Sequence, residues 1–332
     1  KPIALDDKLT PIYPTGEGVS QTRIRRLCAQ ALAEIDNTSL SELLPIHATH
    51  EYSLLTALKF LHNPPATAGL HILAMGKHPA QRRLIREELV AHHLSLLQLR
   101  QNIQKHPAKP LIEKSTQRDE FLAQLSFKLT SAQLKVSAEI SQDMAKPAPM
   151  LRLLQGDVGS GKTIVSALAA LQAIANGQQV ALMAPTELLS EQHRLNFENW
   201  FQPFGIKMAW LTGKVKGKAR KYQLDSIADG SAKMIIGTHA LFQEKVNFFS
   251  LGLSIIDEQH RFGVHQRLAL RKKGVAFDDS GEPLEQLPHQ LIMTATPIPR
   301  TLAMSSYADL DFSIIDELPI GRKPIETTII NS

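Results

Sequence analysis

The chain is poor in cysteine and in long apolar runs. Among its 332 residues it has one cysteine, Cys28, which cannot form an internal disulfide or a cysteine-based metal cluster and which suits a reducing compartment. We interpret Cys28 as a small buried apolar residue. No run approaches the roughly 20 apolar residues that a helix needs to cross a bilayer, so we expect no membrane partner.

Strong charge of one sign is also lacking, because the net charge is only +5. This value fits a polyanionic partner, but many proteins that bind no nucleic acid are equally basic. A hydrophobic content of 43% is enough for a core in more than one folding unit. Since Lys1 is preceded by neither a signal peptide nor an initiating Met, we interpret the sequence as a fragment.

The first 120 or so residues show mainly helical periodicity. Apolar residues recur at helical spacing over residues 20–35, and similar patterns cover residues 51–62 and 79–105. The last of these helices is long enough to connect two domains. It carries four arginines, for which a solvated face is a better explanation than DNA contact: Arg82, Arg83, Arg86 and Arg100.

From residue 150 onward, short β-rich apolar runs alternate with helical segments. The runs are residues 150–154, 180–184, 207–211, 234–237, 253–257 and 291–295. This alternation predicts an α/β fold with a mostly parallel sheet and helices on both faces. Ligands bind at the carboxyl ends of the strands in such sheets. Residues 278–288 are predicted to form an exposed loop.

A phosphate-binding loop follows the first of these strands. Its residues are Gly156, Asp157, Gly159, Ser160, Gly161, Lys162 and Thr163. The glycines let backbone N–H groups point at phosphate oxygens, beside the positive end of the next helix. Lys162 can then reach the β- and γ-phosphates, and the Thr163 hydroxyl can bind Mg²⁺. The flanking strand and helix favour this interpretation over an ordinary glycine-rich turn.

Two adjacent carboxylates, Asp257 and Glu258, come directly after a buried strand. A magnesium-dependent phosphoryl-transfer site needs such a pair: Asp257 would hold the metal, directly or through water, and Glu258 would polarise the attacking water. A solvent-facing turn could also carry two acids. Their place after a strand, downstream of a phosphate loop, favours the catalytic interpretation.

Three more polar segments follow strands and are candidates for binding a nucleic-acid phosphate. They are Pro185 with Thr186, Thr212 with Gly213, and Thr238 with His239. Backbone N–H groups at a helix start can hold an anion, but ordinary capping by Thr186 explains its segment equally well in isolation. The basic residues from Lys214 to Lys221 fit a phosphate backbone or a solvated helix start.

The last apolar strand ends in Thr294 and Thr296, and Arg300 follows. Hydroxyls at this strand end, directed toward the carboxylates, can report whether a γ-phosphate is present. A proline-terminated turn is the alternative for this segment alone.

Together and in this order, the segments resemble the first motor domain of superfamily 2 nucleic-acid helicases, over about residues 127–319. The resemblance implies a RecA-like fold. It places Gln259 and His260 in the catalytic Asp-Glu-x-His motif, and it gives Thr294, Thr296 and Arg300 a role in coupling hydrolysis to DNA contacts. Residues 127–133 resemble the adenine-recognition motif, in which Gln133 would read the base edge and Phe127 would pack near it, selecting ATP.

Residues 260–267 and 296–301 narrow the match to the RecG and transcription-repair coupling families, and residues 11–15, 237–242 and 257–260 favour the RecG family. This resemblance implies an ATP- and Mg²⁺-dependent helicase of the bacterial cytoplasm that remodels stalled forks and Holliday junctions. Branched and duplex DNA are the expected partners, with single-stranded DNA-binding protein as a further candidate. We expect a monomer.

RecG-like proteins have a wedge domain followed by two motor domains, with ATP between the motors. We interpret residues 1–120 as the helical connector from the wedge, residues 121–318 as the first motor domain and residues 319–332 as a linker toward the second. The arginine finger of the second motor has no counterpart in the sequence. The chain alone is therefore expected to bind nucleotide weakly, to hydrolyse it poorly and not to unwind DNA.

Three other functions stay open. A transcription-repair coupling factor would need a surface for RNA polymerase, which the sequence does not show. A nucleotide-gated DNA-binding module without turnover would share the same motifs. A metabolic P-loop kinase would not need Asp-Glu-x-His together with Thr-Ala-Thr.

Overall fold

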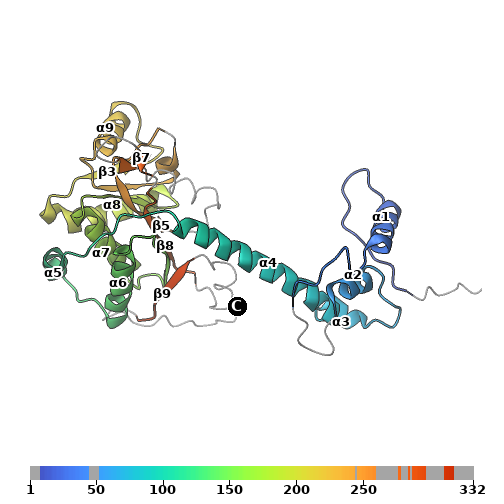
Figure 1. Ribbon diagram of the computed structural model, residues 1–332. Coiled ribbons are helices and arrows are strands. Elements are labelled where there is room, and N and C mark those ends of the chain that lie inside the picture. The colour runs from blue at the N-terminus through green and yellow to red at the C-terminus, as the bar shows by residue number, and fades with distance from the viewer. Residues whose placement is uncertain are drawn as a thin grey trace, which may run out of the picture. The chain divides into compact units, whose positions relative to one another are not determined.

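The computed structural model describes residues 8–44, 52–243, 245–258, 276–277, 283–284, 286–296 and 310–317 (Figure 1). The chain divides into two compact units, Lys1–Ser95 and Leu96–Ser332. The division falls inside the long helix α4 (Pro79–Gln104), so residues 96–120 belong to the second unit. The functional division near residue 120 stays a prediction.

Helices form the first unit: α1 (Gln21–Glu34), α2 (Leu54–His62), α3 (Leu70–Ala74) and most of α4. Ser20 and Ser53 cap the first two helices, because each side chain accepts a hydrogen bond from the backbone N–H three residues on. Helices α1, α2 and α4 match the predicted ranges to within a few residues. Among the described residues, no helix is both long enough and apolar enough to cross a membrane.

Two side chains of this unit differ from the prediction. Cys28 is half-buried, because the apolar face of α1 is covered only in part and Leu27 on the same helix is 53% exposed. Arg83 does not lie on a solvated face. It is buried between the carboxylates of Glu42 and Glu87, and these two ion pairs compensate the guanidinium for the loss of water.

The second unit is built on a seven-stranded sheet with the order β3-β4-β2-β5-β8-β1-β9. Its strands are β1 (Leu151–Gly156), β2 (Gln179–Met183), β3 (Met208–Leu211), β4 (Met234–Gly237), β5 (Leu251–Asp257), β8 (His289–Thr294) and β9 (Asp311–Ile315). All six pairings in this sheet are parallel. The predicted α/β fold with a mostly parallel sheet is confirmed.

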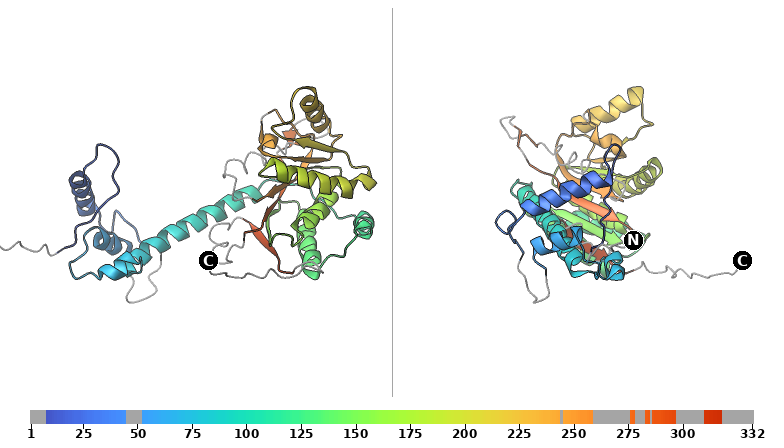
Figure 2. Two further views of the ribbon diagram at one scale, coloured as in Figure 1. Left: turned by 180° about the vertical axis from the view of Figure 1, so that it is seen from behind. Right: turned by 90° about the vertical axis from the view of Figure 1, so that its right-hand side faces the viewer.

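Helices cover both faces of the sheet, because successive strand residues point to opposite sides. Leu154 and Leu182 pack with α5 (Ser115–Gln124), α6 (Ser131–Met144), α7 (Lys162–Ala175) and α8 (Glu187–Phe201). Leu153 and Ala181 pack on the other face with α9 (Gly217–Ala228), the short helix η2 (His239–Phe242) and the end of α4. Figure 2 shows α7 and α8 in front of the strands when the molecule is seen from behind. The turn η1 (Gln202–Phe204) follows α8.

Two parts of the second unit differ from the sequence prediction. Strand β9, which was not predicted, extends the sheet beside β1. Strand β7 (Pro283–Leu284) pairs with β6 (Ala276–Phe277), and Leu287 packs against the core. The prediction of an exposed loop over residues 278–288 is wrong for Leu287, which is partly buried, and for Pro288, which is buried. Residues 278–282 and 285 lie outside the described residues.

Candidate active site

The phosphate-loop residues connect β1 to α7, as their pattern predicted. Gly159 and Gly161 have φ values of 78° and 89°, in the left-handed region that favours glycine. A Cβ on Gly156 would lie 2.4 Å from the Ser160 hydroxyl oxygen. That hydroxyl is buried and has no partner in the described part of the chain. The loop is a tight cradle that only glycine allows at these positions, and it suits a phosphate group.

Lys162 begins α7 and folds back over this cradle. Its Nζ donates hydrogen bonds to the carbonyl oxygens of Gly156 at 2.7 Å and Asp157 at 3.0 Å. Burial lowers the pKa of the Lys162 ammonium. The nearby carboxylates oppose this shift, and the largest of these effects come from Asp257 and then Glu258. The acidic pair is therefore close enough to Lys162 to act on its charge.

The sheet order explains how these residues meet. Strand β8 lies between β5, which ends at Asp257, and the phosphate-loop strand β1. Asp257 is in register with Met293, and Thr294 is in register with Gln155. Thr294 therefore lies between the acidic pair and the phosphate loop, at the same edge of the sheet.

Glu258 is held against the residues that follow β8. Its N–H donates to the carbonyl oxygen of Met293 at 2.9 Å, and its Oε1 accepts from the Ala295 N–H at 3.1 Å. Its φ of 52° is rare for a residue other than glycine. Thr296 donates its N–H to the Thr294 hydroxyl at 3.1 Å. Backbone strain of this kind is typical of functional sites. The hydrogen bonds of Glu258 connect the acidic pair to the segment that contains Thr294 and Thr296.

A pocket of about 530 Å³ opens beside the phosphate loop. It is lined by Phe127, Lys128, Gln133, Gly161, Thr163, Ile164 and Trp200. Phe127 and Gln133, which were predicted to meet adenine, thus share one pocket of a size typical for small ligands. Trp200 was not predicted. It reaches the pocket from α8, and no local sequence pattern marks that approach.

Thr163 and Asp257 are the two residues assigned to Mg²⁺. Hydroxyl and carboxylate oxygens suit this hard cation. Among the described residues, no three His, Cys, Asp or Glu side chains form a group that could hold a metal ion. Asp257 and the phosphate loop lie at the same edge of the sheet, with β8 between their strands.

Residues 130–305, more than half of the chain, match the family model described as DEAD/DEAH box helicase. The chain belongs to this helicase family. ATP-dependent DNA helicase RecG of Haemophilus influenzae is 57% identical over 99% of the chain, and the RecG of Escherichia coli K12 is 59% identical over 98%. The resemblance to RecG that the motifs predicted is confirmed.

A solved structure of RecG bound to a three-way DNA junction is also similar to this helicase-family chain. It is 36% identical, covers 95% of the chain and has a TM-score of 0.68. The chain spans about half the length of the curated relatives it matches, 47% and 46% of the two RecG proteins, and 40% of the chain in the solved structure.

The candidate DNA residues of this helicase-family chain lie at the same edge of the sheet, where the strands have their carboxyl ends, but they follow β3, β4 and β2. The order β3-β4-β2 brings together the segments that contain Thr212 and Gly213, Thr238 and His239, and Pro185 and Thr186. The hydroxyls of Thr212 and Thr238 are buried without a partner among the described residues. Thr186 instead caps α8 by accepting from the Leu189 N–H at 3.3 Å, as the alternative interpretation expected.

Some of the basic residues from Lys214 to Lys221 are paired with protein side chains and some are not. Lys214 pairs with Glu187 at 2.9 Å, and Arg220 donates to Gln243 at 2.7 Å. The side chains of Lys216, Lys218 and Lys221 are exposed. Their charge is thus accessible to a polyanion. Gln259, His260 and Arg300 lie outside the described residues, so their predicted roles stay predictions.

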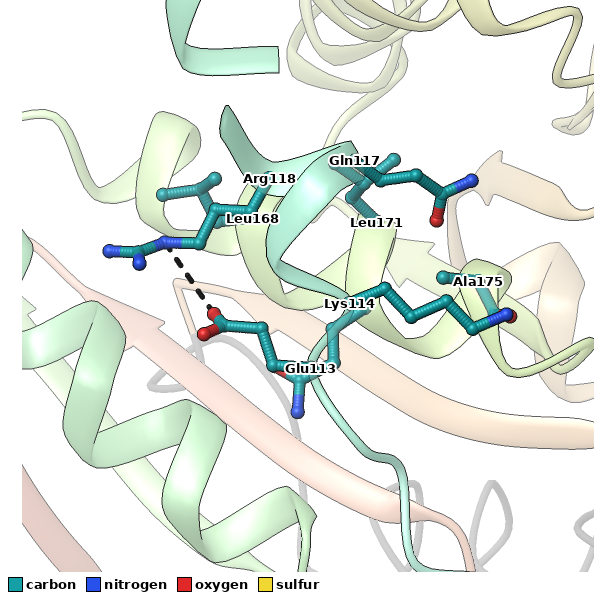
Figure 3. Close-up of a pocket in the computed structure, with 8 residues that line it drawn as sticks. Glu113, Lys114, Gln117, Arg118, Leu168, Leu171 and Ala175 are labelled. Atoms are coloured by element: carbon teal, nitrogen blue, oxygen red, sulfur yellow. Dashed lines mark hydrogen bonds and ion pairs between the residues drawn. The ribbon is translucent and has the colours of Figure 1, made fainter. Parts of the chain in front are cut away.

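A second cavity, between α7 and the segment that begins α5, does not suit a nucleotide (Figure 3). Its volume is about 10 Å³, which is room for one water molecule at most. The ion pair between Arg118 Nε and Glu113 Oε1, at 3.5 Å, lies at this cavity. This cavity is therefore not a candidate nucleotide site.

Proposed function

We propose that this chain carries the first motor domain of an ATP-dependent DNA helicase and translocase that acts on branched DNA in recombination and repair. One observation carries the proposal: the phosphate loop after β1 and the Asp257–Glu258 pair at the end of β5 lie at the same edge of the sheet, with only β8 between their strands. The RecG relatives, one of them solved with a three-way DNA junction, support branched DNA as the substrate class.

The proposed nucleotide is ATP with Mg²⁺. Phe127, Gln133 and Trp200 would surround the adenine, because they line the pocket beside the loop. The loop amides would hold the phosphates, and Lys162 would exchange its two carbonyl partners for phosphate oxygens. Thr163 and Asp257 would hold the magnesium ion, which neutralises charge on the phosphates when bound.

Glu258 would orient the attacking water and accept its proton. Its hydrogen bond to Ala295 supports a link from the hydrolytic site to Thr294, Thr296 and Arg300, which we propose couple hydrolysis to DNA contacts. Gln259 and His260 would complete the catalytic motif.

DNA would lie over the ends of β3, β4 and β2, where the buried hydroxyls of Thr212 and Thr238 have no protein partner among the described residues. Gly213 and His239 are exposed and Pro185 is half-buried, and all three would contribute to this surface. We further propose that residues 1–120 act as the connector, 121–318 as the motor and 319–332 as a linker. We also propose that the protein is a cytoplasmic monomer and that it binds single-stranded DNA-binding protein.

The test is Glu258→Gln in the full-length protein. ATPase rates on forked, duplex and single-stranded DNA should fall by at least about 100-fold, because the general base is lost, while nucleotide binding stays within a few-fold of wild type. Glu191→Gln, an exposed substitution on α8, is the matched control and should keep the wild-type rates. Wild-type protein that binds DNA in a nucleotide-dependent way without turnover would instead identify a nucleotide-gated binding module.

A further inference from the structure

A buried contact joins helix α8 to the carboxylate at the end of β5. His193 Nε2 lies 2.8 Å from Asp257 Oδ2, and the two residues are 6% and 9% exposed. They are 64 positions apart in the sequence, and no motif of the strand-end edge includes His193. A histidine buried at a predicted metal ligand has a direct influence on how that ligand is oriented.

The chemistry of the pair fixes which atom donates. An ionised carboxylate can only accept hydrogen bonds, so the proton of the pair is on His193 Nε2. His193 Nδ1 is buried without a partner in the described part of the chain. The imidazole therefore makes its hydrogen bond to Asp257 and not to its own helix.

His193 does not itself complete a metal cage. No group of three or more potential metal-binding side chains exists among the described residues, and a magnesium ion favours oxygen ligands over imidazole. What His193 can do is occupy one carboxylate oxygen of Asp257. The rotation of that carboxylate is then set by α8 as well as by β5.

We propose that His193 is a positioning residue that orients Asp257 for the magnesium–nucleotide complex. This inference rests on the proposed function, because it concerns the same site. His193 holds Oδ2 through its Nε2–H, so Oδ1 would be the carboxylate oxygen that binds the cation or a water bound to it. Helix α8 begins at the Thr186 cap, about two turns before His193, so the orientation depends on the helix that also borders the candidate DNA edge.

The experiment compares three variants of the full-length protein. His193→Leu removes the donor with similar volume. His193→Gln keeps an N–H near the place of Nε2. Ser190→Ala, one turn earlier on α8, removes a different buried hydrogen bond, in which the Ser190 hydroxyl accepts from Trp210 Nε1 at 2.9 Å. Binding of Mn²⁺ in the presence of a non-hydrolysable ATP analogue is followed by electron paramagnetic resonance, together with kcat, KM for ATP and the melting temperature.

For His193→Leu we expect Mn²⁺ affinity and kcat to fall by about ten-fold or more, as is typical when a partner of a metal ligand is lost. His193→Gln should recover both to within about three-fold of wild type, and Ser190→Ala should leave Mn²⁺ affinity unchanged. The inference is overturned if His193→Leu binds Mn²⁺ as tightly as the wild type. It is also overturned if all three variants lose Mn²⁺ affinity equally, in proportion to their loss of melting temperature. A wild-type protein that binds no Mn²⁺ with the analogue overturns the proposed function instead.

Discussion

The side-chain amide of Gln133 donates a hydrogen bond to the carbonyl oxygen of Ser160 in the phosphate loop, at 2.8 Å. The amide oxygen of Gln133 accepts from the Thr130 N–H at 2.9 Å, and Thr130 in turn caps α6. One buried residue thus connects the start of α6, the phosphate loop and the wall of the proposed adenine pocket. Gln133 keeps a second N–H and a second oxygen lone pair with which it could read a base edge.

The first prediction concerns Gly161→Ala. A Cβ at this position would lie 2.2 Å from Gln133 Nε2, on a backbone with φ of +89°. The change should therefore displace Gln133, break its bond to the loop and weaken ATP binding by at least about ten-fold, in addition to a stability loss of about 1 kcal/mol from the strained backbone. Titration with a fluorescent ATP analogue measures the affinity.

Gly177→Ala is the matched control for Gly161→Ala. Gly177 has a similar φ of +78°, but an added Cβ would have no neighbour within 4 Å. It should lose stability to a similar extent and keep its ATP affinity. If both alanine variants bind ATP equally well, contact with Gln133 is not what Gly161 provides.

The sequence was sufficient for features that depend on local pattern. Strands β1 to β5 and β8 were predicted because each is a short apolar run between helical segments, and the motif residues were identified because they follow those runs. Strand β9 was missed. Its five residues pair with β1 alone in the described sheet, and the run contains Asp311 and Ser313 within it, so it lacks a clear apolar pattern.

Features made by contacts between distant segments were not predictable in this way. His193 and Trp200 are ordinary residues of an amphipathic helix until α8 packs beside β5 and the phosphate loop. Arg83 fitted a solvated face until the fold brought Glu42 to it from 41 positions away. The sequence could therefore predict a candidate site, but it could not predict that His193 and Trp200 would lie beside it.

The second prediction concerns Trp200→Ala. Trp200 lines the 530 Å³ pocket with Phe127, and it packs edge-on against Phe197 at 5.8 Å between ring centroids. Loss of an aromatic face beside a base costs about 1–3 kcal/mol, so ATP affinity should fall by about ten-fold or more. Trp200→Phe should retain most of the affinity, and Trp210→Phe, outside the pocket lining, should retain all of it. Unchanged nucleotide binding in Trp200→Ala would remove this residue from the site.

The third prediction concerns pH and His289, which is buried on β8. Its Nδ1 accepts from the Met150 N–H at 3.1 Å, and its Nε2 donates to the Lys109 carbonyl at 2.9 Å. Burial lowers the pKa of His289 below its usual value of 6.5, although the Lys109 carbonyl and Asp143 oppose the shift. Above pH 6.5 both the folded and the unfolded states are neutral at this residue, so its full contribution to stability is present.

As the pH falls below 6.5, the unfolded state gains the proton first, and the free energy of unfolding decreases until the pH passes the folded-state pKa. Hydrogen–deuterium exchange of the segment around Met150 should accelerate over this range. His289→Asn keeps an acceptor for Met150, but its side chain is too short to keep the bond to Lys109 as well, so it should be less stable at pH 8. Because asparagine does not titrate, the stability of this variant should depend less on pH. Parallel profiles for the two proteins would assign the acid sensitivity to another group.

The fourth prediction concerns Arg100 near the end of α4 and Asp311 at the start of β9. Arg100 Nη2 donates to both carboxylate oxygens, at 2.9 and 2.8 Å, and the two side chains are 25% and 42% exposed. Because both retain contact with water, a double-mutant cycle with Arg100→Ala and Asp311→Ala should give a coupling of about 0.5–1 kcal/mol in the free energy of unfolding. The coupling should shrink at 1 M salt. Arg82→Ala, an exposed change on the same helix, should cost less than about 0.5 kcal/mol. A coupling near zero at low salt would show that α4 is held to the sheet by Ile103 and its apolar neighbours alone.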